Sequence, residues 1–394
     1  MQDLFKNYEL QREELLARIA ESLQLDDTRK KRMEDAYQSI SRLLNEDAGF
    51  FKDIDVDVYP QGSTAIGTTV KPLSGNEFDL DIVVHIKRLF IYYTPAEIYN
   101  ALLKILSGDG RYKEKIEQKN RCVRLNYAGD FHMDILPGCI HLSGDAQKIK
   151  VPDRQRKDWT STSPRGFIEW FMRIANSVVQ PVLKGYYNSL LASVKLRAEV
   201  EDLPKDEFYS KTPLQRAVQL IKRYRDIYFL DKPEFITSSI VLTTLMASHY
   251  RGENSIYLTI ENVVARVINE YNEAIRLHQR FKVYNPVNNE EVFTDSWTGK
   301  HYDVFYAFIT DFYGKWITLK GGFEKSGHEY IKLFGEGIYK ESLQGQIKQM
   351  ARFTTDTTTK ANSLIITSSA YTDSKGQINT NNGYKNEYHR NHGG

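Results

Sequence analysis

The sequence has 394 residues, of which 41% are hydrophobic and 26% are charged, and its formal net charge is +2. This length is enough for two domains or for one large two-lobed unit, and the near-neutral charge excludes a global basic field for nucleic acid. The two cysteines, Cys122 and Cys139, are too few for a disulfide framework, which favours a reducing, cytoplasmic location. No apolar run approaches the ~20 residues of a membrane span, and the amphipathic first residues are not typical of a signal peptide.

The first part of the chain predicts helices followed by a mixed α/β region. Apolar residues recur at helical spacing through residues 1–48. Alternation over residues 53–59 predicts a strand, and its aspartates Asp53, Asp55 and Asp57 suit a solvent-facing edge. Further elements follow in chain order: a strand over 77–86, a helix from Pro95 to Gly108, and strands over 120–128 and 131–140 joined by a hairpin turn at 128–130.

The pattern becomes helical from about residue 164. A Ser-Pro pair and a Thr-Pro pair begin the first two of these helices. Together the segments predict a helical second lobe that ends near residue 352; they span 163–178, 212–229, 236–250, 258–281 and 303–323. From Thr354 the chain is rich in Thr, Ser, Asn and Gly, which predicts a disordered tail.

Three aspartates stand on predicted strands. Asp79 and Asp81 are two residues apart, so their side chains share one face of a strand, and Asp134 lies in the strand over 131–140. Unpaired buried carboxylates are costly, so such a cluster needs a cation or a partner group. Mg²⁺ prefers carboxylate oxygens, and two Mg²⁺ ions can activate an attacking hydroxyl and steady a leaving pyrophosphate. A lone Asp-x-Asp is more often a solvated edge, but the order and spacing of these three aspartates favour a metal site.

A small-residue turn precedes the first two aspartates. Gly62 and Ser63 follow a predicted strand, and a glycine there lets the backbone approach a triphosphate, whose oxygens the serine hydroxyl and amides can bind. The segment is neither a Walker A loop nor a dinucleotide-binding glycine pattern. The turn and the aspartates together predict a site for phosphoryl transfer.

A Gly-Ser turn, a strand with two aspartates and a third aspartate on another strand resemble the signature of the polymerase-β-like nucleotidyltransferases. More closely, the chain resembles the bacterial cGAS/DncV-like nucleotidyltransferases (CD-NTases) of CBASS antiphage systems. The resemblance covers most of residues 25–350. The segments that carry it are 61–72, 77–84, 132–138, 151–171, 212–229 and 285–297.

This resemblance implies an α+β fold, in which a small mixed sheet with helices forms a polymerase-β-like core. The core would pack on a helical second lobe, with the active site in the cleft. The implied division is N-terminal helices including a spine helix at 1–50, the nucleotidyltransferase core at 51–160, a lobe similar to that of oligoadenylate synthases at 161–352, and the tail at 353–394.

The resemblance also implies roles for single residues. Asp79 and Asp81 would hold two Mg²⁺ ions, and Asp134 would complete the site and favour deprotonation of the attacking ribose hydroxyl. The donor triphosphate would be bound by three residues of the turn: Gln61, Gly62 and Ser63.

Two residues of the helical lobe complete the implied site. Lys222 matches a lysine that contacts triphosphate oxygens, although a solvated helix face is the alternative because 222–225 is a basic stretch. Ser239 matches the serine that follows it. Ile240 stands where the animal relative has a base-stacking aromatic residue, so stacking must come from elsewhere, for example from a tyrosine. The histidines on either side of Cys139 lack zinc-ligand spacing, so no DNA-sensing zinc module is expected and no DNA is required.

The activity implied is the synthesis of a cyclic oligonucleotide second messenger from ATP with or without GTP. A cyclic trinucleotide is expected over a dinucleotide, and a downstream effector would bind the product. One alternative is a linear oligoadenylate synthase or an RNA-tailing nucleotidyltransferase. Another is an inactive nucleotidyltransferase fold that only binds partners, which the three intact aspartates disfavour.

The sequence ends in Gly393 and Gly394. A terminal Gly-Gly has no bulky side chain, so it can thread a narrow channel to an adenylating enzyme. Some systems of this family encode partners similar to the E1 and E2 enzymes of ubiquitin transfer that act on the nucleotidyltransferase's C-terminus. Gly394 is therefore a possible conjugation site, and a ragged low-complexity end is the equal alternative.

Overall fold

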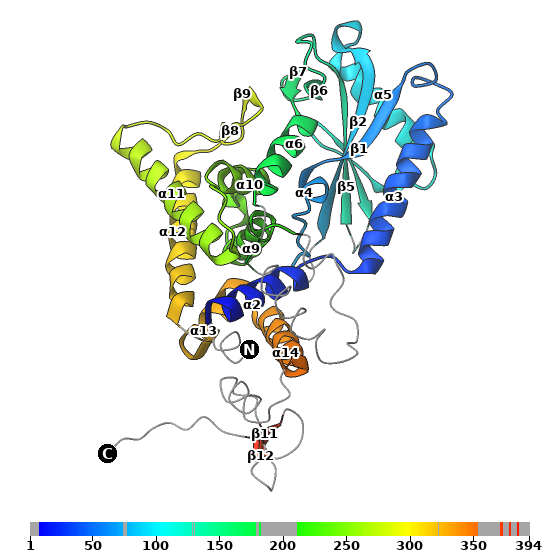
Figure 1. The fold of residues 1–394 in the computed structure, drawn as a ribbon. Coiled ribbons are helices and arrows are strands. Elements are labelled where there is room, and N and C mark those ends of the chain that lie inside the picture. Colours follow the sequence, from blue (N-terminus) through cyan, green and yellow to red (C-terminus); the bar gives the residue numbers. More distant parts are fainter. Residues whose placement is uncertain are drawn as a thin grey trace.

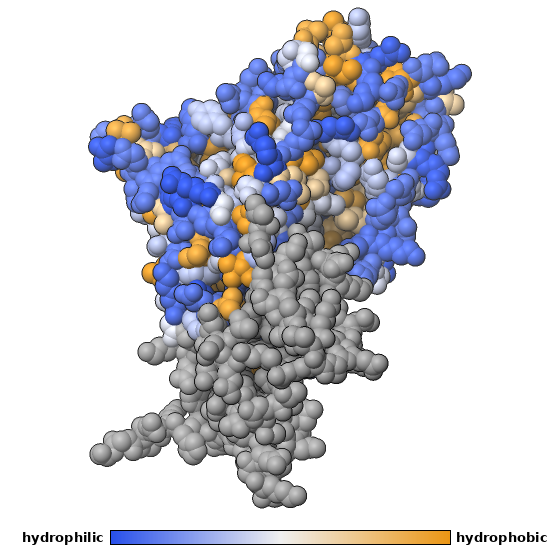
Figure 2. Space-filling model, viewed as in Figure 1, coloured by the Kyte–Doolittle hydropathy of each residue, from blue (hydrophilic) through white to orange (hydrophobic). Residues whose placement is uncertain are grey.

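The computed structural model has two lobes, one built around a sheet and one built from helices (Figure 1). The structure describes residues 8–73, 77–127, 129, 131–178, 181–182, 211–321 and 323–353, together with the pairs 371–372, 378–379 and 384–385. Within these residues, no helix is both long and apolar enough to cross a membrane. On the face shown in Figure 2, the described surface is mostly hydrophilic with scattered hydrophobic residues, as is usual for a globular protein.

The sheet has a mixed topology. Its main path runs β1-β2-β5-β4-β3, and β6 pairs with both β5 and β7. Only β2 and β5 are parallel, and the other neighbours are antiparallel. The strands are β1 (Val56–Pro60), β2 (Phe78–Leu89), β3 (Ile116–Gln118), β4 (Val123–Tyr127), β5 (Phe131–Ile140), β6 (Ile149–Asp153) and β7 (Asp158–Thr162). β1 lies at an edge, as expected, but begins at Val56, because residues 51–54 form turns and a bend.

The central strand β2 is long because a continuous apolar run follows its two aspartates. Residues 82–84 and Ile86 are all fully buried. Ile82, Val84 and Ile86 belong to the core on which helices α3 (Asp27–Asn45) and α5 (Pro95–Gly108) pack, whereas Val83 belongs to a smaller cluster. α5 begins and ends as predicted, since Thr94 and Glu97 form a capping box and Pro95 occupies its first turn.

The helical lobe buries the larger core. Its helices are α2 (Tyr8–Ser22), α6 (Pro164–Ala175), α9 (Pro213–Tyr228), α10 (Ser239–Ser248), α11 (Ile256–Arg276), α12 (Gly299–Thr318), α13 (Phe323–Phe334) and α14 (Glu336–Phe353). α9 is central to this core, and Leu214, Val218 and Ile221 on it are buried. The predicted α+β arrangement of a mixed sheet and a helical lobe is confirmed.

The two N-terminal helices pack in different lobes. Leu15, Leu16 and Ile19 of α2 belong to the core of the helical lobe, whereas Ile40 and Leu44 of α3 belong to the core under the sheet. The chain therefore enters the helical lobe first and then crosses to the sheet. The division into four segments stays a prediction.

Several short elements were not expected from the sequence. β6 and β7 form a hairpin in a segment for which no strand was predicted, and β8 (Tyr284–Asn285) pairs with β9 (Asn288–Val292) in the helical lobe. Within the predicted tail, β10 (Tyr371–Thr372) pairs with β11 (Ile378–Asn379) and β12 (Tyr384–Lys385). The other residues from 354 onward, including Gly394, lie outside the described residues.

Candidate active site

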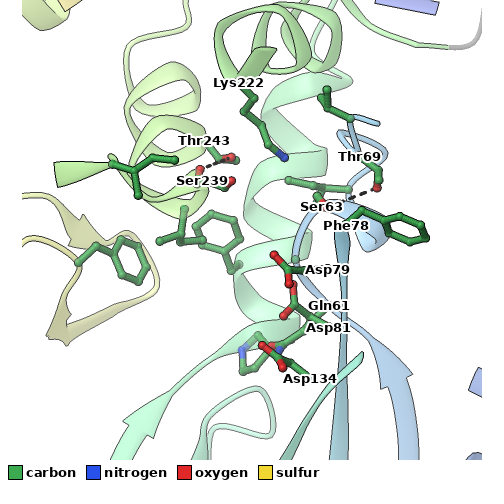
Figure 3. A pocket seen from close by; sticks show the side chains of 18 of the residues that line it. Gln61, Ser63, Thr69, Phe78, Asp79, Asp81, Asp134, Lys222, Ser239 and Thr243 are labelled. Atoms are coloured by element: carbon green, nitrogen blue, oxygen red, sulfur yellow. Dashed lines mark hydrogen bonds between the residues drawn. The ribbon is translucent and has the colours of Figure 1, made fainter. Parts of the chain in front are cut away.

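The parallel pairing of β2 and β5 brings the three aspartates together. Asp81 stands directly opposite Asp134 in the register, and Asp79 stands opposite His132. Neighbouring strands in a sheet lie about 4.8 Å apart, so side chains at matched positions on one face are in close proximity. Figure 3 shows Asp79, Asp81 and Asp134 gathered on one side of the pocket, with Lys222 reaching toward it from α9.

The Gly-Ser turn is built directly against Asp81. Gly62 begins the single helical turn α4 (Gly62–Ala65) and has a φ of +60°, a conformation that favours glycine. A Cβ at this position would lie only 2.5 Å from Oδ2 of Asp81. The backbone N–H of Gln61 donates to the carbonyl of Asp81 at 2.8 Å. Glycine is therefore required here for two independent reasons, conformation and close approach.

Arg124 of β4 binds two of the three carboxylates, and the sequence reasoning missed it. Its Nε and Nη2 donate to the two oxygens of Asp134 at 2.7 and 2.8 Å, and Nη2 also donates to Asp79 at 3.3 Å. Its position directly opposite Asp134 in the β4–β5 register explains the contact. The hydrogen bonds to Asp134 raise the pKa of Arg124, so this residue stays charged and offsets the cluster's negative charge.

Asp81 is the most perturbed of the three carboxyls. Burial, followed by repulsion from Asp134 and Asp79, raises its pKa to about 7. Burial also raises the pKa of Asp79, against the attraction of Arg124. Two carboxyls disfavoured in their charged forms fit a site that gains a cation.

The donor set suits a hard divalent cation, because it consists of carboxylate oxygens on one face. Among the described residues, no group of three or more acidic, histidine or cysteine side chains is already arranged around a common metal position. Arg124 instead holds Asp134 and Asp79. Metal binding at all three aspartates therefore requires Arg124 to share or release these oxygens.

One face of α9 holds the loop that follows the Gly-Ser turn. Gln215 and Gln219 donate to the carbonyls of Ile66 and Thr69, each at 2.9 Å. Lys222 is the third residue of this face. The contacts connect the helical lobe to the turn beside the aspartates.

Lys222 is buried, with 5% of its surface exposed, so the alternative of a solvated helix face is wrong. Its Nζ donates to the carbonyl of Thr68 at 3.0 Å. Burial, followed by the repulsion of Arg225, lowers its pKa to about 7. An ammonium has three donors, so the bond to Thr68 fixes its position and leaves donors for phosphate oxygens.

Ser239 lies at the first turn of α10, where its Oγ accepts a hydrogen bond from Nη1 of Arg225. Arg225 also donates to Asp226 and lines the pocket. The sequence reasoning treated the basic stretch 222–225 only as an argument against Lys222, and so missed Arg225 as a second cation of the pocket.

One cavity of about 940 Å³ collects these groups. All eight residues predicted to bind metal or nucleotide line it: Gln61, Gly62, Ser63, Asp79, Asp81, Asp134, Lys222 and Ser239. The aromatic side chains that the described residues contribute to its wall are phenylalanines rather than the suggested tyrosine; they are Phe78, Phe167, Phe229 and Phe293. His132, one of the two histidines near Cys139, pairs with Glu77 at 2.8 Å.

Comparisons with known proteins identify the family of the chain. The family model described as "Second Messenger Oligonucleotide or Dinucleotide Synthetase domain" matches residues 11–174. A c-di-GMP synthase from Roseivirga ehrenbergii is 39% identical over 86% of this chain and 88% of its own length. The cyclic dinucleotide synthase CdnG from Bradyrhizobium diazoefficiens is 26% identical over 72% of this chain and 69% of its own length.

The fold of the chain is similar to that of solved CD-NTase structures. The structure of the Bradyrhizobium diazoefficiens CD-NTase CdnG in complex with GTP has a TM-score of 0.68 and 21% identity, and the match covers 85% of this chain and 98% of that one. Proteins of this family generally use divalent metal ions for nucleotidyl transfer and take nucleoside triphosphates as substrates. The chain therefore belongs to the CD-NTases, and it is a nucleotidyltransferase that makes a cyclic oligonucleotide second messenger.

Proposed function

We propose that the enzyme joins nucleoside triphosphates, GTP among them, into a cyclic dinucleotide, with two Mg²⁺ ions held by Asp79, Asp81 and Asp134. The observation that carries this proposal is the convergence of the aspartates, the Gly-Ser turn and Lys222 on one cavity. Its volume, about 940 Å³, lies at the upper end of small-molecule pockets, as nucleotides require. The names of the two curated relatives favour a dinucleotide over the trinucleotide expected from the sequence.

The residues of the cavity divide the work of phosphoryl transfer. When bound, the metal ions would supply charge for the transferred phosphate and lower the pKa of the attacking hydroxyl. Gly62 and Ser63 line the cavity, and their amides and the serine hydroxyl would hold the donor triphosphate, with the ammonium of Lys222 as a point charge. Positioning and charge neutralisation are the main needs of such a reaction.

The position of Asp134 supports a role for this residue at the attacking ribose hydroxyl. It lies on β5 beside Asp81, while the Gly-Ser turn lies on the other side of β2, next to β1. Arg124 fixes the orientation of the Asp134 carboxylate through two hydrogen bonds. We infer that Asp134 accepts or draws the hydroxyl proton while Arg124 keeps the carboxylate in position.

The product identifies the reaction directly. The purified chain would be incubated with Mg²⁺ and all four NTPs, and phosphatase-resistant products would be read by mass spectrometry, with D79N/D81N as the control variant. We expect a cyclic dinucleotide containing guanine that the variant does not form. A cyclic trinucleotide would correct the product size, and linear chains alone would favour the oligoadenylate-type or RNA-tailing alternative.

We further propose an antiphage role in which an effector binds the cyclic product; the resemblance to CBASS enzymes supports it. Plaque counts on cells that carry the wild-type or the D79N/D81N system test this role.

A cytoplasmic location agrees with the two free thiols, Cys122 and Cys139. Conjugation of Gly394 by an E1/E2-like partner stays a prediction from the sequence, and conjugates that persist after deletion of Gly394 would refute it.

A further inference from the structure

A second polar group lines the cavity, and the proposed metal and triphosphate chemistry does not use it. It consists of Arg121 before β4, Thr162 at the end of β7, Asn285 of β8 and Glu291 of β9. These residues come from both lobes, since β8 and β9 form the hairpin of the helical lobe. We call them the hairpin group.

Glu291 is the centre of the hairpin group. Its side chain is only 16% exposed. One oxygen, Oε2, accepts from Nδ2 of Asn285 at 2.8 Å and from Oγ1 of Thr162 at 3.0 Å. The other oxygen, Oε1, lies 3.8 Å from Nη1 of Arg121, which is too long for a hydrogen bond. The carboxylate is therefore anchored through one oxygen, and the other retains its capacity to accept.

Arg121 is likewise held through one atom of its side chain while other atoms remain available. Its Nε donates to Asp153 at 3.0 Å, and the side chain of Asp153 is 2% exposed. Asp153 also accepts from the backbone N–H of Arg156, and these contacts hold its pKa below the usual range against the opposing effect of burial. The outer nitrogens of Arg121 therefore remain beside Glu291 as donors, while Nε carries the structural contact.

An oriented carboxylate beside guanidinium donors complements one base better than the others. Guanine presents two adjacent donors, N1–H and N2–H₂, which can both point at the single remaining oxygen Oε1, and next to them the acceptor O6, which an arginine can bind. Adenine and uracil each offer Oε1 only one donor on this edge, so they would make one hydrogen bond fewer to the carboxylate. We propose that Glu291, assisted by Arg121, selects guanine as a base of the substrate.

This inference rests on the proposed function, because it assigns the base that the same cavity accepts. It gives Glu291 a role beyond tying the hairpin to β7, since a structural tie would affect all nucleotides equally. It is also independent of Ile240, which replaces the base-stacking aromatic residue of the animal relative and offers no hydrogen bond for selectivity.

The test compares GTP, inosine triphosphate and ATP as substrates of the wild-type enzyme and of E291Q. Inosine lacks only the N2 amino group, so wild-type kcat/KM for inosine triphosphate should be lower than for GTP by about 10-fold or more. E291Q replaces one acceptor by a donor at nearly constant shape. We expect it to lower kcat/KM for GTP by roughly 10- to 100-fold, to spare ATP and to abolish the preference for GTP over inosine triphosphate.

Glu290→Gln is the matched control, because Glu290 is the exposed neighbour on the same strand. Equal losses for all three nucleotides in E291Q, or no preference of the wild-type enzyme for GTP over inosine triphosphate, would overturn the proposal. If E291Q does not fold, the comparison of GTP with inosine triphosphate on the wild-type enzyme still tests the proposal. Calorimetric binding of non-hydrolysable GTP and inosine triphosphate analogues separates the selection of guanine from the proposed function. A wild-type protein that binds these analogues with the expected preference but forms no product would contradict the proposed function alone.

Discussion

At the scale of single residues, the site contains groups held in unfavourable states. Asp81 has a pKa near 7 because burial and two neighbouring carboxyls oppose its charge, and Lys222 has a pKa near 7 because burial and Arg225 oppose its charge. Each disfavoured charge would be relieved by a ligand of opposite sign, a metal ion for the carboxyl and a triphosphate for the ammonium. These disfavoured charges lower the free energy of unfolding of the ligand-free enzyme, and they favour the binding of ligands of opposite charge.

Asp81→Asn should stabilise the metal-free protein in alkaline solution. The pKa of Asp81 is about 7 in the folded state and 3.8 ordinarily, so the unfolded state loses this proton first and the free energy of unfolding falls as pH rises from about 4 to about 7. With a chelator present, the variant should gain on the order of 2 kcal/mol at pH 8 and less at pH 5. Urea unfolding of D81N and of the surface control D53N measures this, and a D81N protein less stable than wild type at pH 8 would refute it.

Gly62→Ala should lower activity without removing any functional side chain. The new methyl would collide with Asp81 and would impose a strained φ, so the aspartate and the turn must move apart. A shift of about 1 Å in such a site can cost about 100-fold in kcat/KM. Gly110→Ala is the control, because a Cβ there meets nothing within 4 Å. A G62A enzyme with wild-type kcat/KM would contradict this description of the turn.

The sequence predicted which residues form the site better than it predicted how these residues contact one another. Eight of the residues that line the cavity could be predicted: the aspartates and the Gly-Ser turn because catalytic types stand in a fixed order on strand and turn patterns, and Lys222 and Ser239 only through the family resemblance. Arg124, Arg225 and Glu291 could not, because their roles depend on strand register, on a contact between two helices and on a contact between the lobes, respectively. The burial of Lys222 was also hidden, since a basic stretch such as 222–225 is usually solvated.

At the scale of elements, α9 couples the lobes through its face toward the Gly-Ser turn. Gln215 has both ends committed: Oε1 accepts from the backbone of Thr212 in the helix cap, and Nε2 donates to Ile66. The helix start and the loop after the turn are thus fixed by one side chain. This arrangement makes the position of Ser63 depend on the helical lobe.

Gln215→Met tests this coupling. It keeps the side-chain size but removes the cap and loop contacts, so it should cost about 1–3 kcal/mol of stability. It should also raise KM for the nucleotide more than it lowers kcat, because the triphosphate-binding turn loosens. Gln38→Met on α3, whose contact to Glu34 is exposed, is the control. A loss of stability with unchanged KM would mean that α9 supports the fold but does not position the turn.

The element boundaries show where sequence patterns suffice. The helix at 95–108 and the strand at 131–140 were predicted at their observed bounds, because a capping box and a run of buried residues mark them. The β6–β7 and β8–β9 hairpins were missed, since their strands are only two to five residues long. Tertiary contacts, such as that of Asn288 with the carbonyl of Ser161, stabilise them instead.

At the scale of the whole molecule, the active site belongs to neither lobe alone. The sheet supplies the aspartates and the turn, the helical lobe supplies Lys222, Ser239 and the β8–β9 hairpin, and the cavity lies between them. α2 precedes the sheet in sequence but packs in the helical lobe, where Glu13 accepts hydrogen bonds from the N-terminus of α11. The chain therefore crosses between the lobes more than once, which keeps the two halves of the site together.

The most direct test of this account is the rate of pyrophosphate release from GTP with Mg²⁺ in three single variants, D79N, D81N and D134N. If the three carboxylates act at one centre, each variant should lose at least about 100-fold in rate, while the surface control D53N should keep the wild-type rate. Asp53 is exposed and outside the cavity. A wild-type rate in any of the three variants would contradict the account, because that carboxylate would then lie in the cavity without taking part in the reaction.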